Sequence, residues 1–275
     1  MSDRARGGRG PAAREENRRP TKAEKREQAR IEREEIQRRM ARRKKTRALG
    51  TGLVIGAIVI AVLVVFLLPS GATLPSPDDL LAQAGQAKTA AACTDVQNPG
   101  LYGGVSDPND PNYHDQTHIT AGGAFPTLPP FDTYPSIPPT SGPHNPQTAR
   151  AGVYDVSPPI DLVLHSLEHG AAVVWYDPDA PADLIDQIRD FYGQTLTDAN
   201  VGQDWVIVAP YDYPDQGKAG RLPSGTQMAL VAWHRLEECG QSNLAAAYDF
   251  TSQFAFPGSS GRQYAGEAPE AGGAM

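Results

Sequence analysis

Metal-capable side chains gather in one short stretch of the chain. Residues 164–170 read LHSLEHG, so His165 and His169 are four positions apart and Glu168 lies between them. On a helix, residues three or four positions apart share one face, so two imidazoles and a carboxylate would lie together. Imidazole nitrogens and carboxylate oxygens are ligands of Zn and Cu(II). The spacing therefore indicates a candidate metal site.

The same residues match the H-x-x-E-H spacing of inverted zinc peptidases. In those enzymes two histidines hold zinc and the glutamate activates water. Gly170 and an apolar run follow at once, and a further acidic ligand would have to come from Glu237 or Glu238. Three fixed residues without a long helix are a weak indication. Peptidase activity is therefore disfavoured, and no residue is assigned as catalytic.

One long apolar run divides the chain. Residues 48–68 carry no charge and are dominated by Val, Ile, Leu and Ala. At a rise of 1.5 Å per residue, a helix of this length crosses a hydrocarbon core of roughly 30 Å. Five basic residues at 42–47 precede the run, so the positive-inside rule predicts a cytoplasmic N-terminus. We expect one transmembrane helix at 48–68 and an extracytoplasmic C-terminal part.

Charge is divided in the same way. Residues 1–47 hold 18 Lys and Arg against 8 Asp and Glu, a net charge of +10, and the remainder holds 7 against 24, a net of −17. Thr21 and Glu24 form a capping box, which predicts a helix to about Lys45 in this basic cytoplasmic tail. Its Arg and Lys side chains would contact anionic lipid headgroups. Nucleic-acid binding is disfavoured, because the tail has no aromatic residue and its charges alternate.

The outer part divides by composition into three segments. Residues 69–92 are predicted to be a linker with a short helix at 78–84, residues 93–257 one folded domain, and residues 258–275 a disordered tail. Cys93 and Cys239 lie near the two ends of the domain. An oxidising compartment favours a disulfide between them; free thiols or metal ligands are the alternative, less favoured because no CxxC spacing is present.

The domain is predicted to have an α+β fold. Its first half is rich in proline from Pro108 to Pro159, which indicates a long loop region, the Pro-rich loop. Later patterns predict helices at 161–169, 181–194 and 244–254, and strands at 171–176, 205–210 and 227–234. This order fits a small mixed sheet with helices packed on one of its faces around a single core.

Several sequence words together resemble a known bacterial family. They are PPTSGPH from Pro138, GVYD from Gly152, LHSLEHG from Leu164 and VVWYDP from Val173. In this order they resemble domain of unknown function 3105, over about residues 95–255. The resemblance implies an extracytoplasmic domain, often anchored in the bacterial cell membrane by one N-terminal helix, with no settled activity. It implies motif positions at His118, His144, His165, Glu168 and His169, and less firmly at His234.

Three interpretations of these motif positions stay open. The histidines and Glu168 would hold copper or zinc, with Asp115 or Glu168 orienting a ring. Alternatively they form a structural clasp that fastens the Pro-rich loops. In the third interpretation the protein is an accessory or scaffolding subunit of an envelope complex, which exposed apolar residues at 125–134 would favour. The first is the preferred hypothesis.

Overall fold

A computed structural model describes residues 74–196 and 205–273 of the chain. The predicted cytoplasmic tail, transmembrane helix and first part of the linker lie outside these residues. Within the described ranges, no helix has the length and apolar character needed to cross a bilayer.

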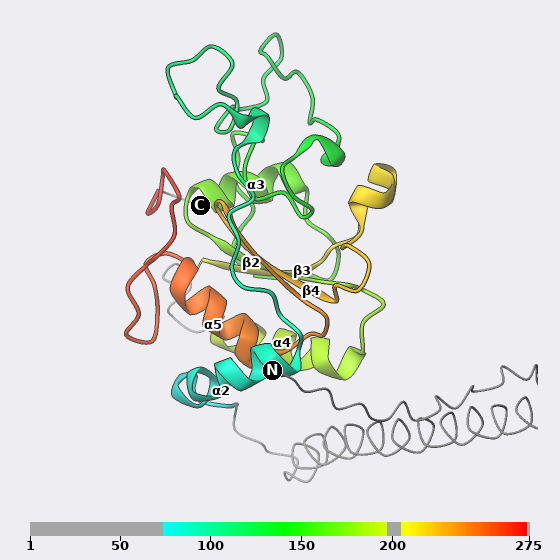
Figure 1. The fold of residues 1–275 in the computed structure, drawn as a ribbon, viewed down its shortest axis with the longest axis vertical. Coiled ribbons are helices and arrows are strands. Elements are labelled where there is room, and N and C mark those ends of the chain that lie inside the picture. The colour runs from blue at the N-terminus through cyan, green and yellow to red at the C-terminus, as the bar shows by residue number, and fades with distance from the viewer. Residues whose placement is uncertain (1–73, 197–204, 274–275) are drawn as a thin grey trace, which may run out of the picture. The chain divides into compact units, whose positions relative to one another are not determined.

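A five-stranded mixed sheet forms the centre of the described domain (Figure 1). Its strands, in sheet order, are β1 (Gly152–Val153), β3 (Val206–Pro210), β2 (Ala172–Tyr176), β4 (Met228–Ala232) and β5 (Arg235–Cys239). β1, β3 and β2 are parallel, whereas β4 is antiparallel to both β2 and β5. The predicted α+β class with a mixed sheet is therefore confirmed.

Helices cover both faces of the sheet, and the expectation of one covered face was wrong. Val173 and Trp175 of β2 pack with α3 (Ile160–Glu168) and the Pro-rich loops. Val174, on the other face, packs with α4 (Ala182–Thr195), α5 (Leu244–Phe254) and α2 (Pro77–Ala90). Figure 1 shows these three helices on the side of the sheet opposite α3. The reason is visible in the central strands, which are apolar at every position and must be buried on both sides.

The folded unit begins before Cys93, because α2 is part of the core. Ser76 caps this helix by accepting a hydrogen bond from the Asp79 amide, and Pro77 occupies its first turn. Leu80 and Ala84 are buried against α5. The segment predicted to be a linker is thus a packed helix from Pro77 onward.

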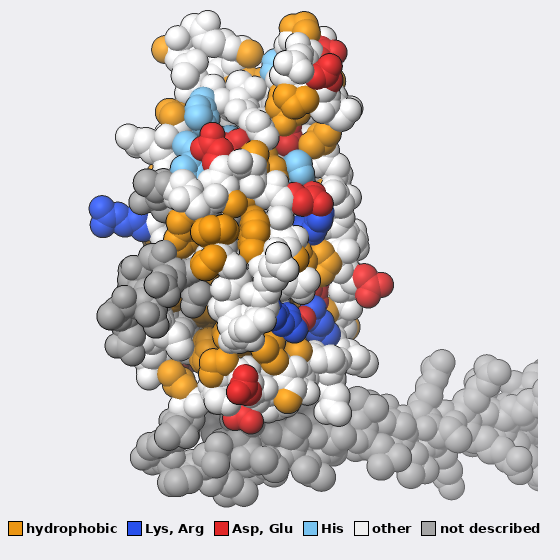
Figure 2. Space-filling model, turned by 90° about the vertical axis from the view of Figure 1, so that its left-hand side faces the viewer, with side chains coloured by type: hydrophobic (Ala, Val, Ile, Leu, Met, Phe, Trp, Pro, Cys, Tyr) orange, Lys and Arg blue, Asp and Glu red, His pale blue; other side chains and the backbone are white. Residues whose placement is uncertain are grey.

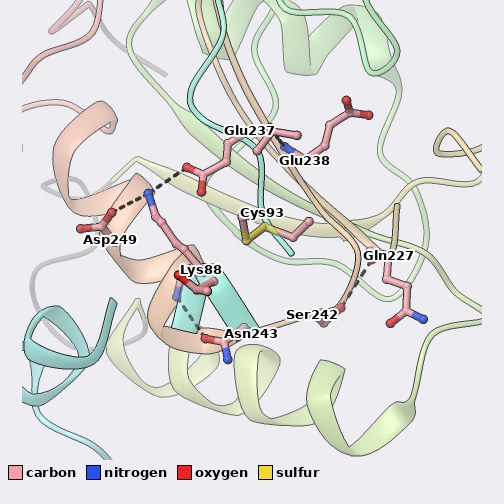
Figure 3. Close-up of a disulfide and its surroundings, with 12 residues drawn as sticks. Lys88, Cys93, Gln227, Glu237, Glu238, Ser242, Asn243 and Asp249 are labelled. Atoms are coloured by element: carbon pink, nitrogen blue, oxygen red, sulfur yellow. Dashed lines mark hydrogen bonds and ion pairs between the residues drawn. A yellow bond between two sulfur atoms is a disulfide. The ribbon is translucent and has the colours of Figure 1, made fainter. Parts of the chain in front are cut away.

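β5 was missed in the sequence because its charged residues are atypical of a strand. Glu237 nevertheless lies fully buried, with its carboxylate 2.9 Å from Lys88 Nζ. Lys88 also lies 2.6 Å from Asp249 of α5, and Cys93 and Cys239 are bonded beside this ion pair at an Sγ–Sγ distance of 2.06 Å (Figure 3). Burial lowers the pKa of Lys88, but its two carboxylate partners outweigh burial, so the net shift is upward. The disulfide and the ion pair together join α2, β5 and α5.

The C-terminal segment, residues 258–273, lies against the domain, although its composition predicts disorder. The Ala265 amide donates to the Gln253 carbonyl at 2.9 Å, and the Glu270 amide donates to the Glu168 carbonyl at 3.0 Å. A composition rule failed here because these contacts are made by backbone groups, which every residue type possesses.

Replacing Lys88 with Met should lower the free energy of unfolding by about 2 kcal/mol, because Glu237 would be left buried without a partner. Urea unfolding followed by tryptophan fluorescence reports on this unit, since all three tryptophans lie within it. Because the pKa of Lys88 is raised, the contribution is present below about pH 10.5 and is lost as the pH rises above that value.

The matched control is Lys218→Met, the same substitution at an exposed lysine. Equal losses in the two variants would contradict a specific role for the Lys88 ion pair.

Candidate metal centre

Two overlapping groups of metal-capable side chains lie at one end of α3. The inner group consists of His118, His144, His165 and Glu168, and the outer group of His165, His169 and Glu270. Within each group, one ligand atom from every residue lies within 4.8 Å of the others. The structure thus brings together all five predicted site residues and adds Glu270.

α3 carries the central residues of both groups. His165 and Glu168 share its buried face, and His169 is its C-cap. Gly170 ends the helix with a positive φ of 99°, and the Ala171 amide then bonds to the Ser166 carbonyl at 2.8 Å. This is the helix stop that the sequence predicts at Gly170.

A tight turn of the Pro-rich loop brings His144 to α3. Gly142 has a φ of 120°, and a Cβ at this position would lie 2.8 Å from the Tyr134 ring and 2.9 Å from the Tyr102 ring. Only glycine fits such a site. The Gly142 carbonyl accepts a hydrogen bond of 2.7 Å from His144 Nδ1. This bond assigns the proton to Nδ1 and leaves Nε2 free to bind an ion.

His165 is held in the same manner. Its Nδ1 donates to the Asn145 carbonyl at 2.8 Å, so its Nε2 carries no proton, and this Nε2 faces His169 Nε2 at 3.0 Å. Ser166 adds a second connection, accepting from the Ala149 amide at 2.9 Å. The loop from Asn145 to Ala149 therefore follows α3 closely. His118 joins through a short bridge, in which the Ile119 amide donates to the His144 carbonyl at 2.6 Å.

Three ligand atoms of the inner group are buried and lack a hydrogen-bond partner among the described residues: His118 Nε2, His144 Nε2 and Glu168 Oε2. Glu168 Oε2 lies 2.9 Å from His144 Nε2 and 3.9 Å from His118 Nε2. The shorter contact is not a hydrogen bond, because both atoms are acceptors when the His144 proton is on Nδ1. Two ligands of a tetrahedral zinc ion are about 3.3 Å apart at usual bond lengths, so the spacing suits a shared ion.

Burial lowers the pKa of His165, and the neighbouring imidazoles of His144, His169 and His118 lower it further. A lowered pKa favours the neutral ring, which is the form that binds metal. The electrostatic surroundings of His165 therefore favour an unprotonated Nε2.

The outer group includes a residue that the sequence analysis missed. Glu270 Oε2 and His165 Nε2 each lie 3.0 Å from His169 Nε2. Gly273 packs on the His169 ring so closely that a Cβ there would lie 2.6 Å from Nδ1. The sequence feature that could have pointed to Glu270 is that Glu267 and Glu270 are the only acidic residues after Asp249. It was overlooked because this segment was predicted to be disordered.

Asp115 orients a histidine, but not one of either group. Its fully buried carboxylate accepts hydrogen bonds from the Tyr102 amide at 2.7 Å and from Ser141 Oγ at 2.6 Å. Its second oxygen lies 2.7 Å from His234 Nε2. His234 occupies the turn between β4 and β5, so Asp115 fastens the Pro-rich loop to that hairpin. A structural clasp thus lies beside the histidine groups.

Glu237 and Glu238, the residues named above for the peptidase interpretation, do not supply its further acidic ligand. Glu237 is paired with Lys88, and Glu238 lies 3.4 Å from Thr226. Neither residue belongs to the inner or the outer group. α3 is nine residues long and ends at Glu168 itself.

A cavity of about 620 Å³ lies elsewhere, at the carboxyl ends of β2 and β3. Its lining includes Arg189, which donates to the Tyr154 carbonyl and to Asp155, and lies 2.7 Å from the Tyr176 hydroxyl. Arg189 thus has its acceptors within the protein, whereas three ligand atoms of the inner group have no hydrogen-bond partner among the described residues, so the histidine groups are the better candidate for a functional site.

Replacing Asp115 with Asn should lower the free energy of unfolding by about 1 to 3 kcal/mol, because a charged acceptor of three hydrogen bonds is lost. Urea unfolding measures the change. Asp132→Asn, an exposed aspartate of the same loop, is the matched control and should unfold as the unmodified chain does. A clasp role would be refuted by an Asp115 variant as stable as the control.

Comparison with known proteins yields one match. No curated protein and no solved structure matches the chain. The matching family model covers residues 132–266, so it begins and ends later than the resemblance range of about 95–255. It includes His144, His165, Glu168 and His169, whereas His118 and Glu270 lie outside it. Residues 132–266 of the chain match the model of the family described as "Protein of unknown function (DUF3105)".

Proposed function

We propose that this protein binds one divalent metal ion, zinc or copper(II), through His118, His144, His165 and Glu168. The observation that carries the proposal is the set of buried, unpartnered ligand atoms in the inner group. Leaving a buried donor or acceptor unpaired costs about 1–3 kcal/mol per group, so a shared ion would remove a substantial penalty.

A purely structural role accounts for only one nitrogen, Nδ1, of the His144 and His165 rings. The hydrogen bonds from Nδ1 of His144 and His165 to loop carbonyls fasten the loop without any ion. They leave both Nε2 atoms beside the Glu168 carboxylate in a buried space. A carbonyl acceptor on one ring nitrogen is the usual partner of a histidine that binds metal through the other. The hydrogen bonds that fasten the loop and the proposed metal bonds therefore use opposite nitrogens of the His144 and His165 rings.

Three imidazoles and one carboxylate favour zinc or copper(II) over other ions. Such a set completes a four-coordinate site with nitrogen and oxygen ligands. Met228, in contrast, is buried in β4 within the core cluster that contains α5, so a thioether site of the kind that binds copper(I) is not supported. Four protein ligands leave no open position, which favours a binding role over catalysis.

Residues that precede the described domain support a proposed location. The uncharged run at 48–68 and the basic residues before it support a single-pass anchor in a bacterial cell membrane, with the metal domain outside. The disulfide between Cys93 and Cys239 is consistent with an extracytoplasmic compartment. The basic tail would then contact anionic lipid on the cytoplasmic side.

The alternative of an accessory envelope subunit gains little from the loop at 125–134. Phe131 and Tyr134 are buried there. Among the described residues, Val96 and Val156 are the large apolar side chains that are exposed. Two separate valines do not form a docking patch of useful size. Metal binding is therefore the better supported proposal.

Full-length protein in detergent should bind one equivalent of zinc or copper(II), measured by elemental analysis after removal of free metal. His144→Ala and Glu168→Gln should each weaken binding by at least about tenfold. Saturating metal should also raise the unfolding midpoint, by mass action on the folded state.

His114→Ala is the matched control, because His114 belongs to neither group and packs edge-on against Phe125. This variant should bind metal as the unmodified chain does. The proposal fails for a metal-free protein that gains no thermal stability from either ion.

A further inference from the structure

His165 belongs to both ligand groups but can serve only one ion at a time. Its Nδ1 is held by the Asn145 carbonyl, which leaves a single lone pair on Nε2. His169 Nε2 lies 3.0 Å from this atom, and the ligand atoms of the inner group lie within 4.8 Å of it. An ion bound to His165 therefore has either inner or outer partners.

The two groups differ in their access to solvent. The Glu270 side chain is 52% exposed, whereas that of Glu168 is 3% exposed and that of His144 is fully buried. The His118 side chain is 39% exposed, but its Nε2 is buried. Figure 2 shows histidine side chains gathered around acidic side chains on one face of the domain. The outer group is thus the one that presents a carboxylate to solvent.

We propose that His169 and Glu270 form an outer position through which the metal ion reaches and leaves the inner group. This inference rests on the proposed metal-binding function. An incoming hydrated ion first exchanges water for Glu270, His169 and His165. It then keeps its bond to His165, while the bonds to His169 and Glu270 break and bonds to His118, His144 and Glu168 form. No electron is transferred, and the ion keeps its charge throughout.

The C-terminal segment holds Glu270 where this exchange requires it. The Glu270 amide donates to the Glu168 carbonyl at 3.0 Å, and the Gly272 amide donates to the His169 carbonyl at 3.2 Å. The segment is therefore fixed to the two residues that end α3. Glu267, three positions earlier, instead pairs with Arg235 of β5. The two glutamates are similarly exposed, and only Glu270 contacts the outer group.

This difference supplies a matched pair of variants, Glu270→Gln and Glu267→Gln. Full-length protein in detergent is mixed with Zn²⁺ held by a coloured chelator, and ion uptake is followed in a stopped-flow instrument. Extraction by excess EDTA gives the reverse rate. Cobalt(II) spectra of the loaded variants report the ligands at equilibrium.

Glu270→Gln and His169→Ala should slow uptake and extraction alike, each by about tenfold, the scale on which a lost ligand acts. Affinity, the ratio of the two rates, should change by less than about threefold, with an unaltered cobalt spectrum. Glu267→Gln should match the unmodified chain, and every variant should bind one ion.

Three results would overturn the outer position while leaving the proposed function intact. The first is that Glu270→Gln takes up and loses the ion at the same rates as Glu267→Gln. The second is that Glu270→Gln shows an altered cobalt spectrum together with weakened affinity. The third is that the chain binds two ions. Failure of the unmodified chain to bind any ion would instead remove the proposed function and this inference together.

Discussion

Two hydrogen bonds between imidazoles and loop carbonyls organise this end of the molecule. His144 Nδ1 bonds to Gly142, and His165 Nδ1 bonds to Asn145. Each bond fixes the position of the loop, and each also fixes which ring nitrogen carries the proton. A long segment without regular structure needs such side-chain partners, because it has no ladder of its own to satisfy its backbone. Without these bonds the ligand atoms of the inner group would not converge.

The sheet provides the rigid support on which this arrangement depends. α3 packs its apolar face on Val173 and Trp175, so its ligand-bearing end is held by the core. On the opposite face, the Lys88 ion pair and the disulfide tie α2 to β5 and α5. The order therefore runs from a central apolar sheet, through α3, to a loop that is held both by polar contacts and by the burial of Phe131 and Tyr134.

The central strands and the helix that carries part of the site were predictable from local sequence patterns. The helix carrying His165 and Glu168 was evident from its periodicity and from Gly170, and the apolar strands were evident from their composition. β5 was not, because burial of Glu237 depends on Lys88, which lies 149 positions away in the chain. Glu270 escaped for a related reason, since backbone hydrogen bonds that hold a glycine-rich segment leave no trace in composition. What local sequence cannot reveal is pairing over long distances.

The inner group also has a consequence for the unfolded chain. Its members span residues 118 to 168, and the disulfide joins residues 93 and 239. An ion in the inner group would close a loop nested within the one closed by the disulfide, and both closures restrict the unfolded ensemble. The domain would then have two cross-links on opposite faces of its sheet. One would respond to reductants and the other to chelators, so the two faces could be loosened independently.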